Sequence, residues 1–183
     1  MRIFLYEEEI FVTMHKSRYQ RIMIFGRPGS GKSTFALMLH QRLGLPLHHL
    51  DKHFFTANWE ERNYDEFIAI QKAILAEDAW IIDGNSTKSL SLRYQRADLV
   101  IFMNYPRMVC YFRVFHRLFY KNPLIDDRAA NCPETVRMNL LRYMWSYDAR
   151  VRPIINELTT AYPTILFLQV SNQRSLRAAC ARI

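Results

Sequence analysis

The sequence predicts an α/β fold, in which helices pack around a parallel β-sheet, for most of its 183 residues. Short apolar runs typical of buried strands alternate with longer segments of helical periodicity, which indicates βαβ units with right-handed crossovers. A glycine-rich motif, G-R-P-G-S-G-K-S, lies between the first apolar run and the first helical segment. Half of the residues are hydrophobic, so the chain can bury a substantial core and is not intrinsically disordered.

Three strands and two helices are predicted in the first half of the chain. The strands cover residues 22–25, 47–50 and 80–82, and the helices cover residues 33–43 and 63–78. Gly44 and Pro46 end the first helix, because glycine adopts the left-handed conformation after a helix and proline cannot continue one. Asn63 begins the second helix, with Glu66 three residues later in a capping-box pattern.

The second half continues the alternation. It is predicted to contain a short helix, a strand, two longer helices, a strand and a terminal helix, at residues 87–96, 99–103, 107–120, 134–160, 164–170 and after Ser171. Pro153 is expected to bend the longest helix. The helix over 107–120 has apolar residues nearly all round, which predicts that it packs into the core.

Residues 1–20 fit this plan least well. Met14 lies eight residues before the first strand, so we expect residues 1–20 to be an extension that is disordered or lies upstream of the true start. Residues 21–183 are expected to form a single domain. Three acids at residues 7–9 interrupt the apolar core of a signal peptide, and three cysteines without a C-x-x-C pair are typical of a reducing compartment. No apolar run approaches the ~18 residues of a membrane span, so we predict a cytoplasmic protein.

The formal net charge of +8 resides entirely in the second half of the chain. Residues 1–92 carry 11 basic and 11 acidic side chains, whereas residues 93–183 carry 14 and 6. Every basic residue of the second half except Lys121 is arginine. This excess favours a polyanionic partner, which is a nucleic acid, an anionic membrane or a phosphorylated small molecule.

Residues 26–33 match the phosphate-binding pattern G-x-x-x-x-G-K-[ST] in the strand–loop–helix context that it requires. Backbone N–H groups of such a loop, with the following helix N-terminus, bind phosphate oxygens. Lys32 is expected to reach the β- and γ-phosphates of ATP, and the Ser33 hydroxyl to ligate Mg²⁺. The residues predicted to bind the donor are Gly26, Arg27, Pro28, Gly29, Ser30, Gly31, Lys32, Ser33 and Thr34.

The remaining motifs favour a small kinase among the P-loop proteins. The sequence contains neither the N-K-x-D of GTPases nor the L-S-G-G-Q of transport ATPases. Asp51 and Asp83 follow the second and third strands, and the carboxyl ends of parallel strands meet in one crevice. We favour Asp83 beside the metal, with Ser33, and Asp51 at the acceptor hydroxyl. The reverse assignment stays open, as does a loop-capping role for either aspartate.

Two further patterns surround Asp51. His49, Asp51 and His53 have an i, i+2, i+4 spacing that resembles metal ligands, but a transition-metal site needs further ligands that the pattern does not supply. The aromatic stretch from His53 to Trp59 either lines an acceptor pocket or belongs to the core beneath a loop.

An ordered set of motifs extends this reading: R-P-G-S-G-K-S-T, G-L-P-L-H-H-L-D-K, W-I-I-D-G-N, L-R-Y-Q-R-A-D-L-V-I-F, Y-P-R, N-C-P-E and R-x-R-P. With these motifs the chain resembles the adenylate-kinase-like P-loop proteins called DNA topology modulation proteins, or FlaR-like kinases, from about Tyr19 onward. The resemblance implies a nucleoside-monophosphate-kinase-like fold with three αβα layers, strand order 2-3-1-4-5, a helical lid and an ATP donor site. The family name implies a link to DNA supercoiling.

The same resemblance implies roles for particular residues. Asp83, Gly84 and Asn85 lie where related kinases place a metal-shell or acceptor-binding loop, and Arg93 and Arg107 match recurring arginines that we assign to the acceptor. The lid is expected at about residues 113–133.

Three positions depart from the family pattern. Family members commonly have an acid where this chain has Asn104, a tyrosine at Ser86 and a glycine at Asn131. These departures affect the predicted acceptor contacts more than the donor site.

Three arginines of the predicted lid are candidates for stabilising the transferred phosphoryl group. Planar guanidinium groups bind such charge in a bidentate manner. Arg113 and Arg117 lie at i, i+4 on one helix face, next to the polar stretch that contains Arg128. With Lys32 and Asp51 they complete the predicted catalytic set, although each arginine also suits a solvated surface.

The alternative function is that of a P-loop ATPase which binds DNA through the arginine-rich half and regulates its topology. Neither a recognition helix nor a mixed Lys/Arg platform is evident, so DNA is the secondary partner. The helix over 107–120 also allows contact with a membrane surface. The acceptor itself stays open among nucleoside monophosphates, nucleosides and other small hydroxylated metabolites.

Overall fold

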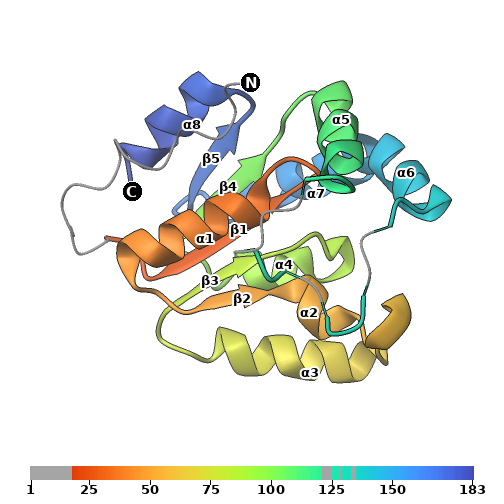
Figure 1. Cartoon of the computed structure of the whole chain (residues 1–183). Helices are drawn as coiled ribbons and strands as arrows, with labels where there is room; N and C mark the ends of the chain where they lie inside the picture. The colour runs from red at the N-terminus through yellow and green to blue at the C-terminus, as the bar shows by residue number, and fades with distance from the viewer. Residues whose placement is uncertain (1–17, 121–124, 128, 133–134) are drawn as a thin grey trace.

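The computed structural model describes residues 18–120, 125–127, 129–132 and 135–183. Its centre is a five-stranded parallel sheet of order β2-β3-β1-β4-β5, with helices on both faces (Figure 1). This arrangement confirms the predicted fold class and strand order. The strands are β1 (Arg21–Gly26), β2 (Leu47–His49), β3 (Trp80–Asp83), β4 (Leu99–Met103) and β5 (Leu166–Val170).

The helices lie in the predicted segments, except that the short helices Leu50–Phe54 and Ala57–Trp59 are not predicted, and Leu50 belongs to a helix and not to the strand expected over 47–50. They are α1 (Lys32–Leu43), α2 (Leu50–Phe54), η1 (Ala57–Trp59), α3 (Tyr64–Leu75), η2 (Thr87–Ser89), α4 (Leu90–Tyr94), α5 (Arg107–Arg117), α6 (Met138–Trp145), α7 (Tyr147–Ala161) and α8 (Gln173–Cys180). Gly44 ends α1 with a left-handed φ of 69°, and the Asn63 side chain accepts the amides of Asp65 and Glu66 at the start of α3, as predicted. None of the helices in the described ranges is long and apolar enough to cross a bilayer.

The long helix expected over residues 134–160 is wrong in two respects: the described residues 135–137 are not helical, and the helix that follows is broken. The chain forms two helices, which meet at Ser146, and Pro153 lies inside α7 without ending it. The Ser146 hydroxyl donates to the Arg142 carbonyl, 3.1 Å away, and the Arg150 guanidinium donates to the carbonyls of Tyr143 and Ser146. These side chains satisfy carbonyl groups at the break, which a helix end otherwise leaves unpaired.

Two apolar cores lie on the opposite faces of the sheet. Along β1, Ile22 and Ile24 pack on the face covered by α1, α5 and α8, while Met23 and Phe25 pack on the face covered by α3, α4 and α7. All four side chains are completely buried, and burial of each contributes about 1.5–3 kcal/mol. The uniform hydrophobicity of the central strands follows from this two-sided cover.

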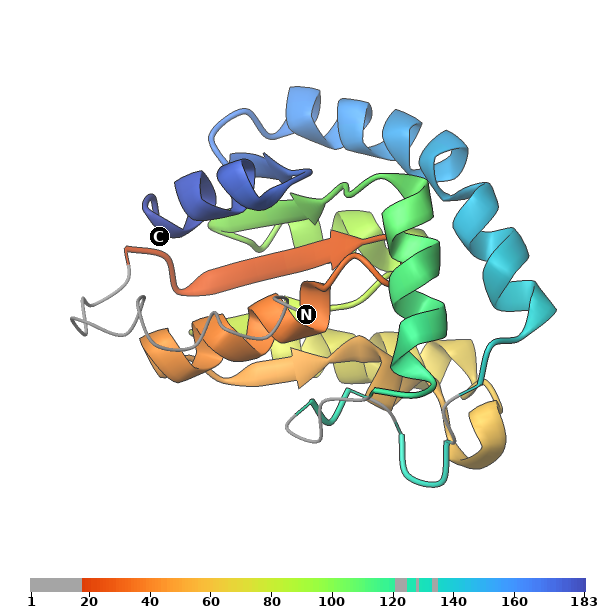
Figure 2. The same cartoon turned by 45° about the horizontal axis from the view of Figure 1, so that its top comes forward.

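The expectation that the helix over 107–120 packs into the core is confirmed for only one side of α5. Cys110 and Val114 are buried, but Met108 and Phe112 are 73% and 62% exposed, because only one side of α5 meets the rest of the fold. Figure 2 shows α5 standing across the end of β1, beside the loop that leads into α1. The helix therefore lies at the carboxyl ends of the strands, in contact with the loop that leads into α1.

Some predictions fall outside the described residues. These include Met14 and nearly all of the expected N-terminal extension, since residues 1–17 are not described. In the predicted lid, residues 121–124, 128 and 133–134 are not described either. The domain boundaries and the choice of start codon stay predictions.

Candidate active site

The phosphate-binding loop joins β1 to α1 at the carboxyl edge of the sheet. The Ser30 amide donates to the Arg27 carbonyl over 3.0 Å, which closes the turn, and Gly31 precedes α1 with a left-handed φ of 92°. Gly29 has a φ of 79°, and a β-carbon at this position would lie 2.3 Å from the Cys110 carbonyl oxygen of α5. Only glycine permits this approach of loop to helix. The Ser30 hydroxyl is buried without a hydrogen-bond partner in the described part of the chain, as suits a donor for a phosphate oxygen.

Lys32 lies among three carboxylates. Burial opposes its charge, but Asp83, Asp51 and Asp127 outweigh burial and raise the pKa of Lys32 above its ordinary value. The ammonium group also lies 3.5 Å from the Ser33 hydroxyl. Lys32 is therefore held as a cation at the start of α1, where the helix N-terminus adds further positive potential for phosphate.

Asp83 ends β3 and is held by a residue of the neighbouring strand. The sheet register pairs His49 of β2 with Asp83, and His49 Nδ1 lies 2.6 Å from Asp83 Oδ1. Burial by itself raises the pKa of Asp83, but the hydrogen bond from His49, the charge of Lys32 and the nearby Ser33 hydroxyl outweigh it and hold the pKa below its ordinary value. Asp83 is therefore ionised, although it is buried and only 2% exposed.

The same carboxylate provides a test of the predicted magnesium site. Asp83 Oδ2 is buried and has no hydrogen-bond partner among the residues of the structure that are described. An unpaired carboxylate oxygen beside a serine hydroxyl is the donor set that Mg²⁺ prefers, with water and substrate phosphates as its remaining ligands. Asp83 and Ser33 thus fit the ion.

Asp51, in the first turn of α2, faces the same group of charges but responds in the opposite direction. Burial raises the pKa of Asp51 above its ordinary value, although Lys32 counteracts the rise. A carboxylate whose pKa is raised towards neutrality accepts a proton more readily than an ordinary aspartate does. The pKa values of the two aspartates are therefore shifted in opposite directions.

The loop after Asp83 is supported from within the protein. Arg93 is completely buried, and its guanidinium donates to the carbonyls of Gly84 and Ser86 over 3.2 and 2.6 Å. Burial lowers the pKa of Arg93 to about 10. Asn85 Oδ1 accepts the Gly26 amide over 3.0 Å and so links this loop to the phosphate-binding loop. These described contacts are internal, and the acceptor contacts expected of Gly84, Asn85 and Arg93 stay predictions.

Two of the three candidate lid arginines lie beside the phosphate-binding loop. Arg113 Nη1 donates to the Ser30 carbonyl over 3.1 Å, and its guanidinium stacks on Tyr105 with its central carbon 4.6 Å from the ring centroid. Arg117 Nη1 lies 4.0 Å from a carboxylate oxygen of Asp127, which is 9% exposed. Arg128 lies outside the described residues.

Two other predicted arginines point away from the phosphate-binding loop. The Arg27 side chain is 3% exposed and donates to the Met144 carbonyl and to Asp148, so it connects the loop to α6 and α7. Arg107 stacks on Trp145 of α6, with 4.3 Å between the guanidinium carbon and the ring centroid. The structure therefore does not bring Arg107 together with Lys32, Asp51 and Asp83.

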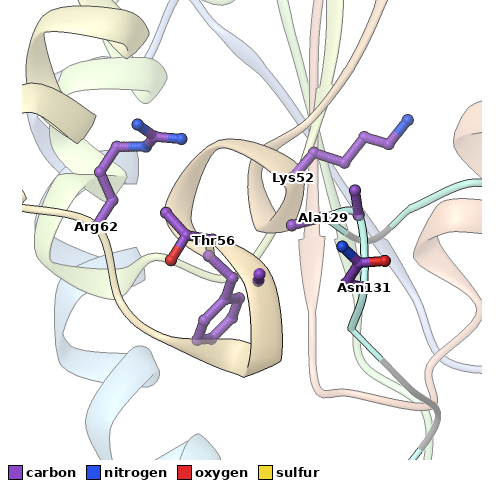
Figure 3. A pocket seen from close by; sticks show the side chains of 8 residues that line it. Lys52, Thr56, Arg62, Ala129 and Asn131 are labelled. Carbon is purple, nitrogen blue, oxygen red and sulfur yellow. The ribbon is translucent and has the colours of Figure 1, made fainter.

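A cavity of about 370 Å³ lies where part of the predicted lid meets the segment around α2 (Figure 3). Its lining residues are Lys52, Phe55, Thr56, Ala57, Arg62, Ala129, Ala130 and Asn131. The two segments are joined by a hydrogen bond from the Cys132 thiol to the Thr56 carbonyl, 3.1 Å long, and by one from the Asn58 amide to the Asn131 carbonyl. Asn131 has a φ of 60°, in the left-handed region that glycine adopts most readily.

Sequence reasoning missed the roles of His49, Asp127 and Tyr147. His49 was considered only as a metal ligand, yet no group of three His, Cys, Asp or Glu side chains converges within the described ranges. Tyr147 donates to Asn85 Oδ1 from α7, 62 residues away. The H-H-L-D motif at the end of β2 placed His49 near the site, but only the strand register pairs it with Asp83.

The comparisons with known proteins show the fold. A shikimate kinase from Acinetobacter baumannii, solved in complex with shikimate, matches this chain with a TM-score of 0.51 and 14% sequence identity, over 90% of each chain. No family model matches the sequence, and no curated protein does. At this identity the likeness extends to the P-loop fold and not to the acceptor.

Proposed function

We propose that this protein is an ATP-dependent kinase that transfers the γ-phosphoryl group to a small hydroxylated acceptor. The observation that carries the proposal is the grouping of Lys32, Asp83 and Asp51 at the end of the phosphate-binding loop. The three residues come from α1, α2 and β3 and have complementary charges. The likeness of the fold to a kinase of small molecules supports the assignment.

The residues suggest a division of labour in an in-line transfer. Lys32 and the loop amides bind the donor phosphates, and Arg117 and Arg113 stabilise the charge that develops on the transferred group. Asp51 accepts the proton of the acceptor hydroxyl while the hydroxyl oxygen forms a bond to the γ-phosphorus. The bond between the γ-phosphorus and the oxygen that bridges it to the β-phosphate breaks, and ADP leaves. Ser33 and Asp83 would hold Mg²⁺, and the ion would supply charge neutralisation at the donor phosphates.

The finer family assignment also belongs to this proposal. The sequence motifs resemble those of FlaR-like, adenylate-kinase-like proteins, and the observed strand order agrees with that resemblance. We propose membership of this group on the motifs from W-I-I-D-G-N to R-x-R-P. We further propose that a lid at about residues 113–133 covers the site and that the protein acts in the cytoplasm.

The test is a screen of hydroxylated acceptors for ADP production, with Lys32→Ala as the control. We expect at least one acceptor to raise ADP formation above the basal rate, and Lys32→Ala to abolish the rise and weaken ATP binding. If no acceptor raised turnover and Lys32→Ala left ATP affinity intact, the kinase assignment would fail.

The DNA-binding alternative is judged in the same experiment. Its main support was the excess of arginine after residue 92, but the structure directs several of these side chains inward or onto neighbouring rings. Arg93 is buried, Arg107 stacks on Trp145 and Arg113 binds the phosphate-binding loop. DNA binding without ATP turnover on any acceptor would favour the alternative.

A further inference from the structure

The outer side of α5 exposes a row of large apolar side chains. The row consists of Met108, Phe112, Phe115 and Phe119, which are 73%, 62%, 45% and 80% exposed. The amides of Phe119 and Tyr120 donate to the His116 carbonyl and continue the turn beyond α5, so Phe119 extends the row. We propose that this row is the interface at which two copies of the chain pair, antiparallel and about a two-fold axis.

The spacing of the row suits a second helix. Its members are four, three and four positions apart, which is the spacing of the seam between two helices that pack side by side. At ~100° per residue they cover an arc of only ~60°. A helix that lies on a membrane has a large apolar face opposite its Lys and Arg residues, whereas a strict narrow row is typical of a coiled-coil seam.

A two-fold axis through the middle of α5 makes the row complementary to itself. In antiparallel pairing Met108 faces Phe119 of the second copy, and Phe112 faces Phe115. The first pair is a thioether against an aromatic ring, and the second is a pair of aromatic rings. Both kinds of contact are favourable, so each copy presents the surface that the other one needs.

The positions beside the row do not bring like charges together. Val109 and His116 lie on one side of it, and Tyr111 and Leu118 lie on the other. The antiparallel arrangement sets Val109 against His116 of the second copy, and Tyr111 against Leu118. Neither α5 nor α6 contains an acid, so this face offers no countercharge to a basic partner. A second copy is thus a better fit than a strongly basic protein.

Some rings beside the row are already ordered. His116 stacks on Tyr120 with 4.8 Å between ring centroids, and it lies 5.8 Å from the ring of Phe112. Rings that pack along one helix lose little conformational freedom when a partner covers them. The row is therefore preorganised for pairing.

The exposed area is sufficient for a dimer. A large side chain of this kind offers ~200 Å², so the row exposes roughly 500 Å² in each copy and pairing removes roughly 1,000 Å². Specific interfaces bury at least about 1,000 Å². Trp145 of α6 is also exposed and stacks on Arg107 in the first turn of α5, which enlarges the apolar surface. Figure 1 shows α5 and α6 at the same end of the molecule.

The interface and the phosphate-binding loop use different sides of α5. Arg113 donates to the Ser30 carbonyl, and at ~100° per residue it lies ~130° from the middle of the row. Gly29 meets the helix at Cys110, which is buried. Pairing therefore leaves the contacts of α5 with the loop in place, and the inference does not rest on the proposed function.

The experiment measures the mass of the full chain by sedimentation equilibrium over a range of concentrations. We expect twice the chain mass of 21.9 kDa at tens of micromolar, with dissociation on dilution. Phe112→Glu and Phe115→Lys are each expected to raise the Kd of the dimer at least ~100-fold, because the two-fold axis applies each change twice. Tyr64→Glu alters an exposed ring of α3, away from the row, and is expected to leave the Kd unchanged.

A mixture of the two variants separates loss of the interface from structural damage. In the antiparallel arrangement the introduced carboxylate of Phe112→Glu faces the introduced ammonium group of Phe115→Lys, while the two unchanged rings still face each other. We expect the mixture to form a 1:1 dimer although neither variant pairs with itself. A misfolded variant would not be rescued in this way, and failure of the mixture to pair would refute the antiparallel arrangement.

Other occupants of the row give different results. A monomer at all concentrations would overturn the proposal. Binding of that monomer to phosphatidylserine vesicles, lost in Phe112→Glu, would identify the row as a membrane-binding surface instead. A dimer that survives both substitutions would use another interface and would overturn the proposal as well. ADP formation is measured separately, so failure of the dimer and failure of the kinase are distinguished.

Discussion

The proposed donor and acceptor regions of this protein are built in different ways. The donor region is one continuous loop, residues 26–34, fixed by close contacts such as Gly29 against α5 and the Ser30 carbonyl on Arg113. The acceptor region joins α2 and η1 to residues 125–132 through single hydrogen bonds and an exposed ion pair. Backbone sterics specify the loop over residues 26–34, so a short sequence motif predicts it. Weak contacts between segments that are distant in the sequence specify the region around α2 and η1.

Asp83→Asn is expected to have the largest effect, because it removes the charge in the donor region on which the magnesium site depends. We expect kcat to fall about 10²–10³-fold, the range observed when one transition-state contact of this kind is removed. His49→Gln removes only the group that orients Asp83 and is expected to raise the Mg²⁺ concentration for half-maximal rate about tenfold. Titration of ADP formation with Mg²⁺ checks both, and equal effects of the two variants would contradict the ranking.

Gly29→Ala tests whether sterics define the donor region. The new β-carbon would meet the Cys110 carbonyl in a backbone conformation that alanine avoids, so we expect a loss of about 2–4 kcal/mol and a clear fall in Tm. Gly44→Ala is the matched control, since its φ is also positive but no atom lies within 4 Å of the added carbon. It is expected to cost about 1 kcal/mol, and comparable losses in thermal melts would refute the steric argument.

Asp51 and Asp83 are expected to affect stability in opposite directions. The folded-state pKa of Asp83 is below the ordinary 3.8, so its ionised form stabilises the fold above about pH 4, and this contribution is lost as the pH falls through the folded-state pKa. The folded-state pKa of Asp51 is above 3.8, so its ionisation costs stability at neutral pH. At pH 7 Asp83→Asn should lower Tm and Asp51→Asn should raise it, while reducing turnover.

The pH dependence of these two variants provides the control. Each variant is compared with the unmodified protein as the pH is lowered from 7 towards 4. The difference in Tm should shrink first for Asp51→Asn, because Asp51 has a higher folded-state pKa than Asp83. A rise in Tm for Asp83→Asn at pH 7 would show that its charge is not stabilised as the geometry indicates.

Cys132→Ala is expected to have the smallest effect and to act in the acceptor region alone. The variant loses the hydrogen bond from the thiol to the Thr56 carbonyl, the one that Sγ accepts from the Trp59 amide, and part of a buried side chain, which together cost about 1–3 kcal/mol. ATP affinity, measured by calorimetry, should not change, because no described contact of Cys132 reaches the phosphate-binding loop. A loss of ATP affinity would mean that the two regions are coupled more tightly than their contacts indicate.

The sequence by itself determined the layers of the fold and the donor loop. Strand and helix periodicity depends on neighbouring residues, and the motif around Lys32 encodes its own backbone geometry, so both were predicted within a few residues. Asp51 and Asp83 were placed at strand ends for the same local reason. The helix over 134–160 was predicted less well. At its break the side chains of Ser146 and Arg150 donate to the carbonyls of Arg142 and Tyr143, and the helical periodicity of the sequence does not indicate these contacts.

Only the tertiary structure decided which residues support the site. The register of β2 against β3 places His49 on Asp83, the packing of α4 buries Arg93 beneath the loop, and the position of α6 draws Arg107 onto Trp145. Each of these contacts joins residues of different elements, and its energy depends on distances that no local pattern encodes. The arginine excess was visible in the composition, but the direction in which each guanidinium points is a property of the packed elements.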